Sequence, residues 1–234
     1  MKSLYLGSYF GIPVKVHSSF LLILVMIAYI AFTEEMTGKE ALLFSSLIFL
    51  MFFSVLLHEY GHALMARRYN IKTVDIIMSP IGGLARMELP PLMPKKELMI
   101  ALAGPMVNLV IAAMIYLIFR IMGLTGLSPD YEVVDLLDIM AHPIGYLELL
   151  AGINVVLFGF NLIPAFPMDG GRILRALLSL RLTRLKATGI AVMIGQSFAV
   201  GFMIYGALNQ LWSLLLIGPV IFMMARREYD IVRR

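Results

Sequence analysis

Long apolar segments dominate this chain and restrict it to folds that keep most residues away from water. Of the 234 residues, 60% are hydrophobic and only 15% are charged, which is outside the usual range for water-soluble proteins. Runs of about 20 apolar residues are long enough to cross a bilayer as helices. We expect six membrane segments, at residues 17–32, 41–66, 98–122, 145–163, 187–206 and 211–226.

Charged residues alternate between the connections of these segments. All but two of the 19 Lys and Arg residues fall on one side of a six-span arrangement, the exceptions being Lys39 and Arg120. The opposite side is rich in acidic residues, between positions 34 and 40 and between 130 and 138. By the positive-inside rule, both termini are cytoplasmic. We therefore expect a multi-pass protein of the cell membrane. The net charge of +4 is too modest to indicate nucleic-acid binding.

The second segment is interrupted by a polar stretch, HEYGH, at His58–His62. Residues four apart share a helix face, so both imidazoles reach one ion, while Glu59 points about 100° away and lies beside it. This H-E-x-x-H pattern supplies two zinc ligands and an adjacent general base. Ionisable groups in hydrocarbon are costly and indicate a functional site. The distance along the helix to Arg67 places the site about 13 Å below the basic rim.

A catalytic zinc site usually has three protein ligands and one exchangeable water. The chain has no cysteine, so the third ligand must be a histidine or a carboxylate. The two remaining histidines, His17 and His142, lie at segment ends, where an ordinary interfacial role is favoured for each.

Asp169 is the better candidate for the third ligand. Pro164 and Pro167 break the fourth segment before it reaches the cytoplasmic rim. Gly170 lets the backbone turn tightly after Asp169, so a carboxylate in this break can face a metal. The alternative role for Asp169 is a cap or turn residue before the next helix. Asn161 is suited to bind a substrate carbonyl or oxyanion, or to tie off backbone groups freed by the prolines.

These motifs resemble those of the site-2 protease family of intramembrane zinc metalloproteases. The family's first motif appears as His58–His62, and its second, Asn-x-x-Pro followed by Asp-Gly, appears at 161–164 and 169–170. The resemblance implies one Zn²⁺ per chain, bound by His58, His62 and Asp169, with Glu59 as the catalytic acid/base. Asn161 matches a position thought to contact substrate.

The third segment contains a further stretch that is similar to a family feature, at residues 103–108. Gly104 and Pro105 are candidates for structural support, as Pro164 and Gly170 are in the second motif. Gly104 favours close helix packing, and Asn108 favours hydrogen bonding across helices. A direct catalytic role for Asn108 is an open alternative.

The resemblance also indicates how the chain is organised. We expect one domain over residues 1–234, with a catalytic core at about 41–180 and peripheral gate helices at about 17–32, 187–206 and 211–226. The segments are similar to the six-span subgroup with archaeal and sporulation-type members. We expect no PDZ domain and no C-terminal nucleotide-sensing module.

The expected fold is that of an all-α polytopic membrane protein with about six transmembrane helices and short membrane-associated β segments. Residues 71–87 have strand-like character around Pro80 and Gly82-Gly83, and residues 11–17 favour another short strand. The edge of such a hairpin can receive an unwound substrate as an added strand. Simple connecting loops are the alternative.

The predicted function is zinc-dependent intramembrane endopeptidase activity on transmembrane segments of membrane proteins. The implied partners are a transmembrane protein substrate and the lipid bilayer, and the sequence does not indicate an oligomeric state. A zinc or proton transporter is the alternative, because buried polar residues also line ion pathways. A single concentrated site without a convincing inverted repeat favours hydrolysis. A catalytically silent substrate-binding scaffold is a third possibility.

Overall fold

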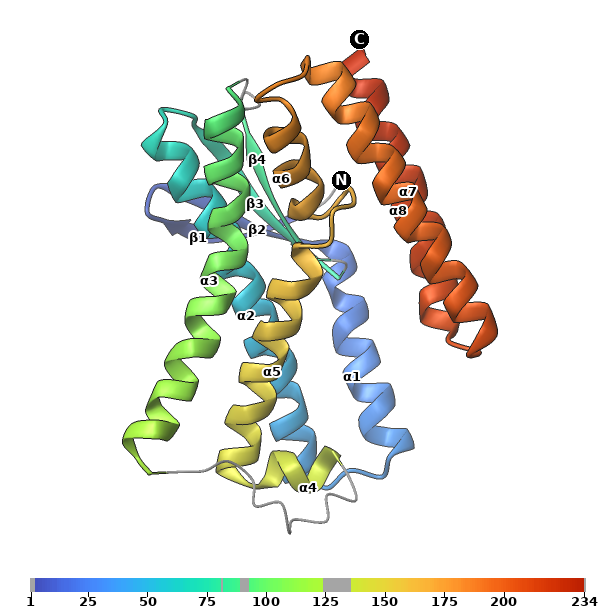
Figure 1. Cartoon of the computed structure of the whole chain (residues 1–234). Helices are drawn as coiled ribbons and strands as arrows, with labels where there is room; N and C mark the ends of the chain where they lie inside the picture. The colour runs from blue at the N-terminus through green and yellow to red at the C-terminus, as the bar shows by residue number, and fades with distance from the viewer. Residues whose placement is uncertain (1–2, 81, 89–92, 124–135, 234) are drawn as a thin grey trace. The chain divides into compact units, whose positions relative to one another are not determined.

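The computed structural model describes residues 3–80, 82–88, 93–123 and 136–233. Within these residues the chain is mostly helical, and a small sheet of four strands is built from two separate stretches of chain (Figure 1). The expected combination of apolar helices with short β segments is therefore confirmed.

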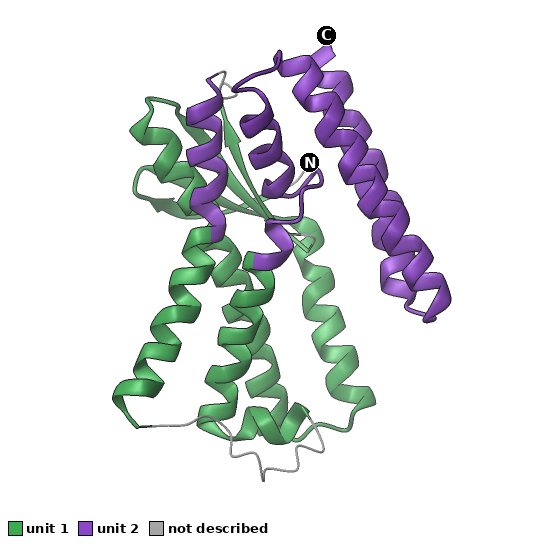
Figure 2. Ribbon diagram, in the orientation of Figure 1, with its two compact units in different colours: residues 1–89, 106–158 green, residues 90–105, 159–234 purple. Residues whose placement is uncertain are grey.

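The chain folds as two compact units, which Figure 2 distinguishes by colour. Unit 1 comprises residues 1–89 and 106–158, and unit 2 comprises residues 90–105 and 159–234. Both divisions fall inside continuous helices, α3 (Pro94–Ile121) and α5 (Pro143–Asn161). In α3 the division directly follows Pro105, a residue that removes one hydrogen bond from the helix ladder. The proposed separation into a catalytic core and gate helices stays a prediction.

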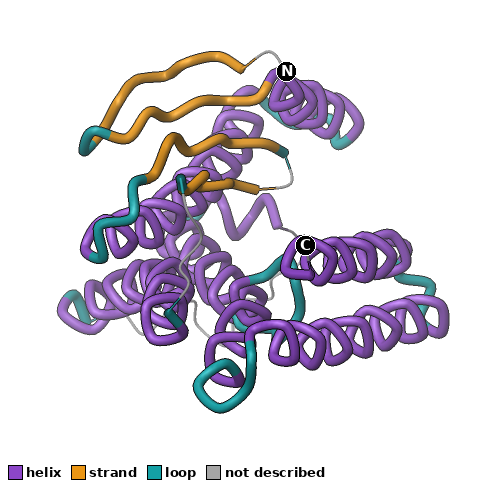
Figure 3. Tube along the Cα trace, turned by 90° about the horizontal axis from the view of Figure 1, so that it is seen from above, coloured by secondary structure: helices purple, strands orange, loops and turns teal. Residues whose placement is uncertain are grey.

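The sheet of unit 1 has the strand order β1-β2-β3-β4 (Figure 3). Its strands are β1 (Ser3–Tyr9), β2 (Ile12–His17), β3 (Thr73–Ser79) and β4 (Gly82–Met87). The central β2–β3 pair is parallel and the outer pairs are antiparallel. Phe10 and Gly11 both have positive φ, 52° and 71°, as a two-residue type I′ hairpin turn requires. The predicted strands in 11–17 and 71–87 are confirmed, whereas β1 was not predicted.

One face of the sheet packs on the helices of unit 1. In β2 and β3 the buried apolar residues lie two positions apart, and Val14 pairs with Ile76, so they point to one side of the sheet. They are buried in a cluster with residues of α1 (Leu21–Thr33) and α2 (Gly38–Arg68). The buried members are Ile12, Val14, Ile23, Ile27, Phe52, Tyr60, Ala63, Ile76 and Met78.

A buried carboxylate, Asp75 on β3, joins strands β2, β3 and β4. The Asp75 side chain has no exposed surface, and Arg86 donates to both of its oxygens at 2.6 Å, from β4. Lys15 on β2 donates to Asp75 Oδ2 at 2.7 Å. The hydrogen bonds from Arg86, helped by Lys15, hold the pKa of Asp75 at about 2 despite the opposing effect of burial.

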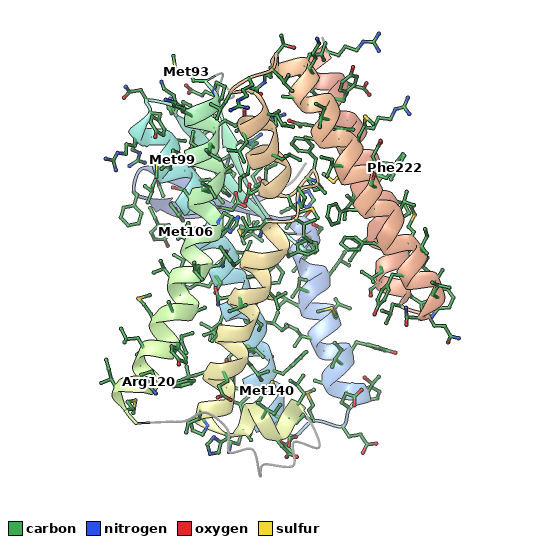
Figure 4. All side chains as sticks on the ribbon, viewed as in Figure 1. Met93, Met99, Met106, Arg120, Met140 and Phe222 are labelled. Carbon is green, nitrogen blue, oxygen red and sulfur yellow. The ribbon has the colours of Figure 1, made fainter. Side chains whose placement is uncertain are left out.

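Helix α2 is the long central element of unit 1. It starts with a capping box in which Thr37 and Glu40 satisfy each other's backbone amides. It contacts α1, α4 (Leu136–Ala141), β3 and β4. A hydrogen bond of 2.6 Å between Ser46 Oγ and Tyr146 Oη links α2 to α5. On α4, Met140 is almost fully buried (Figure 4).

Unit 2 contains the start of α3 together with α6 (Asp169–Leu178), α7 (Arg184–Leu208) and α8 (Trp212–Arg233). Helices α7 and α8 form an antiparallel pair, in which Gly218 lets α8 approach Met203 and the carbonyl of Ala199 (Figure 1). The position of a Cβ at Gly195 would lie 2.9 Å from Ala165 Cα, so this glycine serves close packing rather than flexibility.

A buried ion cluster ties the helices of unit 2 together. Arg175 on α6 donates to Glu97 on α3 at 2.9 Å and to Glu228 on α8 at 2.5 Å. Arg184 at the start of α7 also reaches Glu97, at 3.2 Å. The Arg175 guanidinium lies 5.0 Å from the ring centre of Phe166 in the preceding loop. Such a cluster keeps each buried charge paired, as a low-dielectric environment requires.

Four helices within the described residues are long and apolar enough to cross a membrane: α2, α3, α5 and α7. They correspond to the second to fifth predicted segments. The first predicted segment is a shorter apolar helix, residues 18–33, and the sixth corresponds to α8, which ends in a charged stretch. Six spans are thus not confirmed. Arg120, one of the two exceptions to the charge distribution, is near the end of α3 (Figure 4), and residues 130–135 of the acidic connection lie outside the described residues.

The substitution Asp75→Asn should lower the free energy of unfolding by about 2 kcal/mol, because it weakens hydrogen bonds between charged groups at a buried site. Since the pKa of Asp75 falls from about 3.9 in the unfolded chain to about 2 in the fold, its contribution is present above pH 4. It should be lost as the pH falls from about 4 towards 2.

Thermal unfolding of the detergent-solubilised protein measures this effect. The matched control is Glu88→Gln, which removes the exposed ion pair with Lys72 and should change stability by less than about 1 kcal/mol. Equal stability of Asp75→Asn and wild type would contradict the assigned role of Asp75.

Candidate metal centre

Helix α2 places the two predicted histidine ligands side by side. His58 and His62 are one helical turn apart, and both are buried, with exposed fractions of 5% and 3%. Their Nε2 atoms are 3.1 Å apart, and the ring planes are nearly perpendicular. The helix therefore brings two nitrogen atoms to one point, as the spacing predicted.

This pair fits the requirements of zinc. A tetrahedral zinc ion with bonds of about 2.0–2.1 Å separates two ligand nitrogens by about 3.3 Å, close to the 3.1 Å between the Nε2 atoms.

The far side of the His58 ring is held by Asn108 on α3. His58 Nδ1 lies 2.7 Å from Asn108 Oδ1, and Asn108 is fully buried. A ligating histidine commonly donates its other N–H to such an acceptor, which fixes the ring. The predicted hydrogen bond of Asn108 across helices is therefore present, and its partner is a candidate metal ligand.

Two further polar residues of this network were not predicted. Asn154 on α5 accepts from Asn108 Nδ2 at 3.0 Å and donates to Ser54 Oγ on α2 at 3.2 Å. Asn154 is fully buried and lies in the stretch 149–160 of α5, whose other residues are apolar. An amide in the middle of a membrane segment is the signal that would have indicated it, because such groups need internal partners.

The carboxylate of Glu59 points to the sheet instead of to the histidine nitrogens. Glu59 Oε2 accepts the backbone N–H of Ala85 on β4 at 2.8 Å. Gly83 makes room for this contact, since a Cβ at that position would lie 2.5 Å from Glu59 Cγ. Because β4 is the last strand of the sheet, its amide at Ala85 is available to a group other than a neighbouring strand. The sequence did not identify Gly83 or Ala85 as partners of Glu59.

The residues of the second motif belong to unit 2. Asn161 is the last residue of α5, and Pro164 lies in the loop before α6. Asp169 is the first residue of α6, and its carboxylate is 3.8 Å from the Arg172 guanidinium. Gly170 is helical, and a Cβ there would lie 2.2 Å from the carbonyl oxygen of Ile163. Its lack of a side chain therefore serves a close approach of the loop, not the tight turn that was predicted.

The other residues singled out from the sequence lie apart from the histidine pair in the chain and belong to helices or helix ends. Gly104 and Pro105 are buried within α3. His17 caps the short 3-10 helix of residues 18–20, accepting the amide of Ser19 at 3.2 Å. His142 directly precedes α5. His17 thus has a local structural role, and its interfacial position stays a prediction.

Together these features define a candidate metal centre on a membrane-length helix, in which Asn108 of α3 holds the first of the two histidines. The chain belongs to Peptidase family M50, whose model matches residues 46–135 and 132–202.

Individual relatives agree with this assignment. The chain is 36% identical, over 98% of its length, to zinc metalloprotease MJ0392 of Methanocaldococcus jannaschii, and it covers 61% of that protein. It is 30% identical over 134 residues to stage IV sporulation protein FB of Bacillus subtilis, covering 57% of this chain and 40% of that protein. The chain thus spans only part of the curated relatives.

A solved structure extends the similarity to the fold. The structure of the site-2 protease from Methanocaldococcus jannaschii matches with a TM-score of 0.67 and 34% identity, covering 97% of this chain and 95% of that one. The resemblance read from the motifs is therefore confirmed, and zinc is the metal that the family indicates.

Replacing one imidazole should remove the metal. His62→Gln keeps a polar side chain of similar length but lacks the Nε2 lone pair, so zinc bound per chain should fall from about one to below about 0.1 after brief chelation. Elemental analysis of the purified protein measures it. His142→Gln, the same exchange outside the pair, should retain zinc, and equal loss in both variants would contradict a specific site.

Proposed function

We propose that this protein is a zinc-dependent intramembrane endopeptidase that cleaves transmembrane segments of membrane proteins. The observation that carries the proposal is the buried histidine pair of α2, with nitrogens 3.1 Å apart on a helix of membrane-spanning length. A hydrolytic metal centre in that position acts on peptide bonds that lie within the bilayer. Membership of Peptidase family M50 supports the reaction class.

Glu59 serves as the general base in this proposal. When bound, zinc polarises the scissile carbonyl and increases the acidity of water. Glu59 lies next to His58 but outside the histidine pair, so its carboxylate is available to take the proton of the attacking water. It then passes a proton to the departing amine. The Ala85 N–H holds this carboxylate in place between the two transfers.

Asp169 completes the ligand set in this proposal. It is a buried carboxylate that starts α6, directly after a loop broken by prolines, and it corresponds to the second family motif. Two histidines and one carboxylate are a common ligand set of hydrolytic zinc sites, and they leave one position for water. Asn161, which ends α5, is proposed to bind the substrate backbone.

The proposed substrate is a membrane protein whose spanning helix unwinds locally, because helical carbonyls are otherwise bonded within the helix. Both termini of the chain are proposed to be cytoplasmic, on the basis of the distribution of basic residues. Addition of the unwound segment to the outer edge of β4 stays a prediction.

The variant Glu59→Gln tests the catalytic assignment. Gln keeps the acceptor for the Ala85 N–H but takes up no proton, so cleavage of a reconstituted transmembrane substrate should fall about 10²–10⁴-fold, with zinc content unchanged. Glu88→Gln, at the exposed end of the sheet, is the matched control and should cleave like wild type.

Two results would contradict this proposal. Equal cleavage by wild type and Glu59→Gln would remove Glu59 from the mechanism. Zinc flux across liposomes without any proteolysis would favour the transporter alternative.

The variant Asp169→Asn tests the third ligand. The exchange preserves size but removes the charge, and zinc affinity should fall by more than about 100-fold, since even outer partners of a ligand contribute about 10–100-fold. Competition with a chromogenic chelator measures the affinity. Asp138→Asn on α4 is the matched control, and an affinity of Asp169→Asn equal to that of this control would exclude Asp169 from the ligand set.

A further inference from the structure

A relay of buried side chains runs from Ser54 to the back of His58 within unit 1. Asn154 and Asn108 have no exposed surface, and Ser54 is 4% exposed. The links measure 3.2 Å from Asn154 Nδ2 to Ser54 Oγ, 3.0 Å from Asn108 Nδ2 to Asn154 Oδ1, and 2.7 Å from His58 Nδ1 to Asn108 Oδ1. Three helices, α2, α3 and α5, contribute to it.

The order of donors and acceptors along this relay follows from the orientation of the Asn154 amide. An asparagine amide has two unlike ends, an oxygen that only accepts and an NH₂ that only donates. One end of the Asn154 amide lies 2.9 Å from the backbone carbonyl of Leu150. A carbonyl only accepts, so this end must be the NH₂. The oxygen of Asn154 is therefore turned towards Asn108.

The orientation of Asn154 in turn determines the orientation of Asn108 and the protonated nitrogen of the His58 ring. An acceptor at Asn154 Oδ1 requires the NH₂ of Asn108 to face it, which turns Asn108 Oδ1 towards His58. Because that oxygen only accepts, His58 Nδ1 must carry the proton. A neutral imidazole protonated at Nδ1 has its lone pair on Nε2, the atom that faces His62.

We propose that Asn154 is a positioning residue that fixes the metal-binding tautomer of His58 through Asn108, with the carbonyl of Leu150 as the anchor. This inference rests on the proposed zinc site. It adds the residues that keep the lone pair of His58, the first proposed ligand, on Nε2. Asn154 reaches His58 only through Asn108 in this relay.

The opposite orientation is strongly disfavoured. If Asn108 turned over, its oxygen would face the oxygen of Asn154, and its NH₂ would require a lone pair on His58 Nδ1. The proton would then sit on Nε2 and block metal binding. Two facing oxygens without a proton between them leave buried acceptors unsatisfied, and water is scarce at this depth. The relay therefore gives the His58 tautomer with its proton on Nδ1 a lower free energy than the tautomer with its proton on Nε2.

Ser54 has a lesser part. It accepts the second N–H of Asn154, but the bond to the Leu150 carbonyl already fixes the orientation of the amide. A change at Ser54 should therefore affect the metal less than a change at Asn154.

The experiment measures zinc affinity of the full chain in detergent by chelator competition, and it compares three variants. Asn154→Leu removes the group that orients Asn108, so affinity should fall about 10–100-fold. Asn108→Leu removes the acceptor for His58 Nδ1, so affinity should fall by a similar factor. The double variant should stay within about threefold of Asn108→Leu, because no amide is left for Asn154 to orient.

Controls separate this role from general packing. Ser46→Ala breaks another hydrogen bond between α2 and α5, to Tyr146, and should leave zinc affinity unchanged. Asn154→Ala is a second variant that removes the same amide without adding a branched side chain. It should weaken zinc binding in the wild-type background and cause little further loss in Asn108→Leu.

Two outcomes would overturn the inference. Wild-type affinity in both Asn154 variants would show that the relay does not act on His58. An equal loss of affinity from Asn154→Leu in the wild-type and Asn108→Leu backgrounds would show a packing effect instead of orientation. A wild-type chain that binds no zinc would instead refute the proposed function and, with it, the relay.

Discussion

The need to satisfy every polar atom inside an apolar environment governs how unit 1 is built. A histidine on a membrane-length helix exposes two ring nitrogens, and each needs a partner that the lipid does not supply. His58 meets this need by using one nitrogen towards His62 and the other towards Asn108. Asn108 in turn requires Asn154. The hydrogen bonds that hold the candidate metal centre are therefore the same ones that connect α2, α3 and α5.

The sheet provides a different environment for the remaining functional group of α2. Glu59 is one residue from His58 along the helix, yet its carboxylate is bound to a strand amide instead of to a side chain of another helix. The strand that carries this amide is itself fixed by Arg86 and Asp75 at its centre. His58 and Glu59, the proposed ligand and the proposed base, thus have separate hydrogen-bond partners, Asn108 on α3 and Ala85 on β4.

Much of this arrangement could be predicted from local sequence. The helical spacing of His58 and His62 and the strand-like residues of the hairpin depend on short-range geometry, and both predictions are confirmed. Asn154 was missed because its role depends on which helices pack together, and a single amide in an apolar run does not name its partner. The first strand was missed because its residues are mostly exposed and lack a buried alternating face. The roles of Asp169 and Asn161 stay proposals that rest on their motif.

The tight contact at Gly170 has a consequence for how the second motif works as a unit. No atom fits between this residue and the carbonyl oxygens of Leu162 and Ile163, and Gly171 is packed almost as closely on Ala165 and Phe166. The loop and the first turn of α6 thus interlock as a single rigid piece. Transfer of this carboxylate to another scaffold would therefore require the whole of residues 161–172. The Asp-Gly pair alone would lack the loop backbone that packs against it and orients the Asp169 side chain.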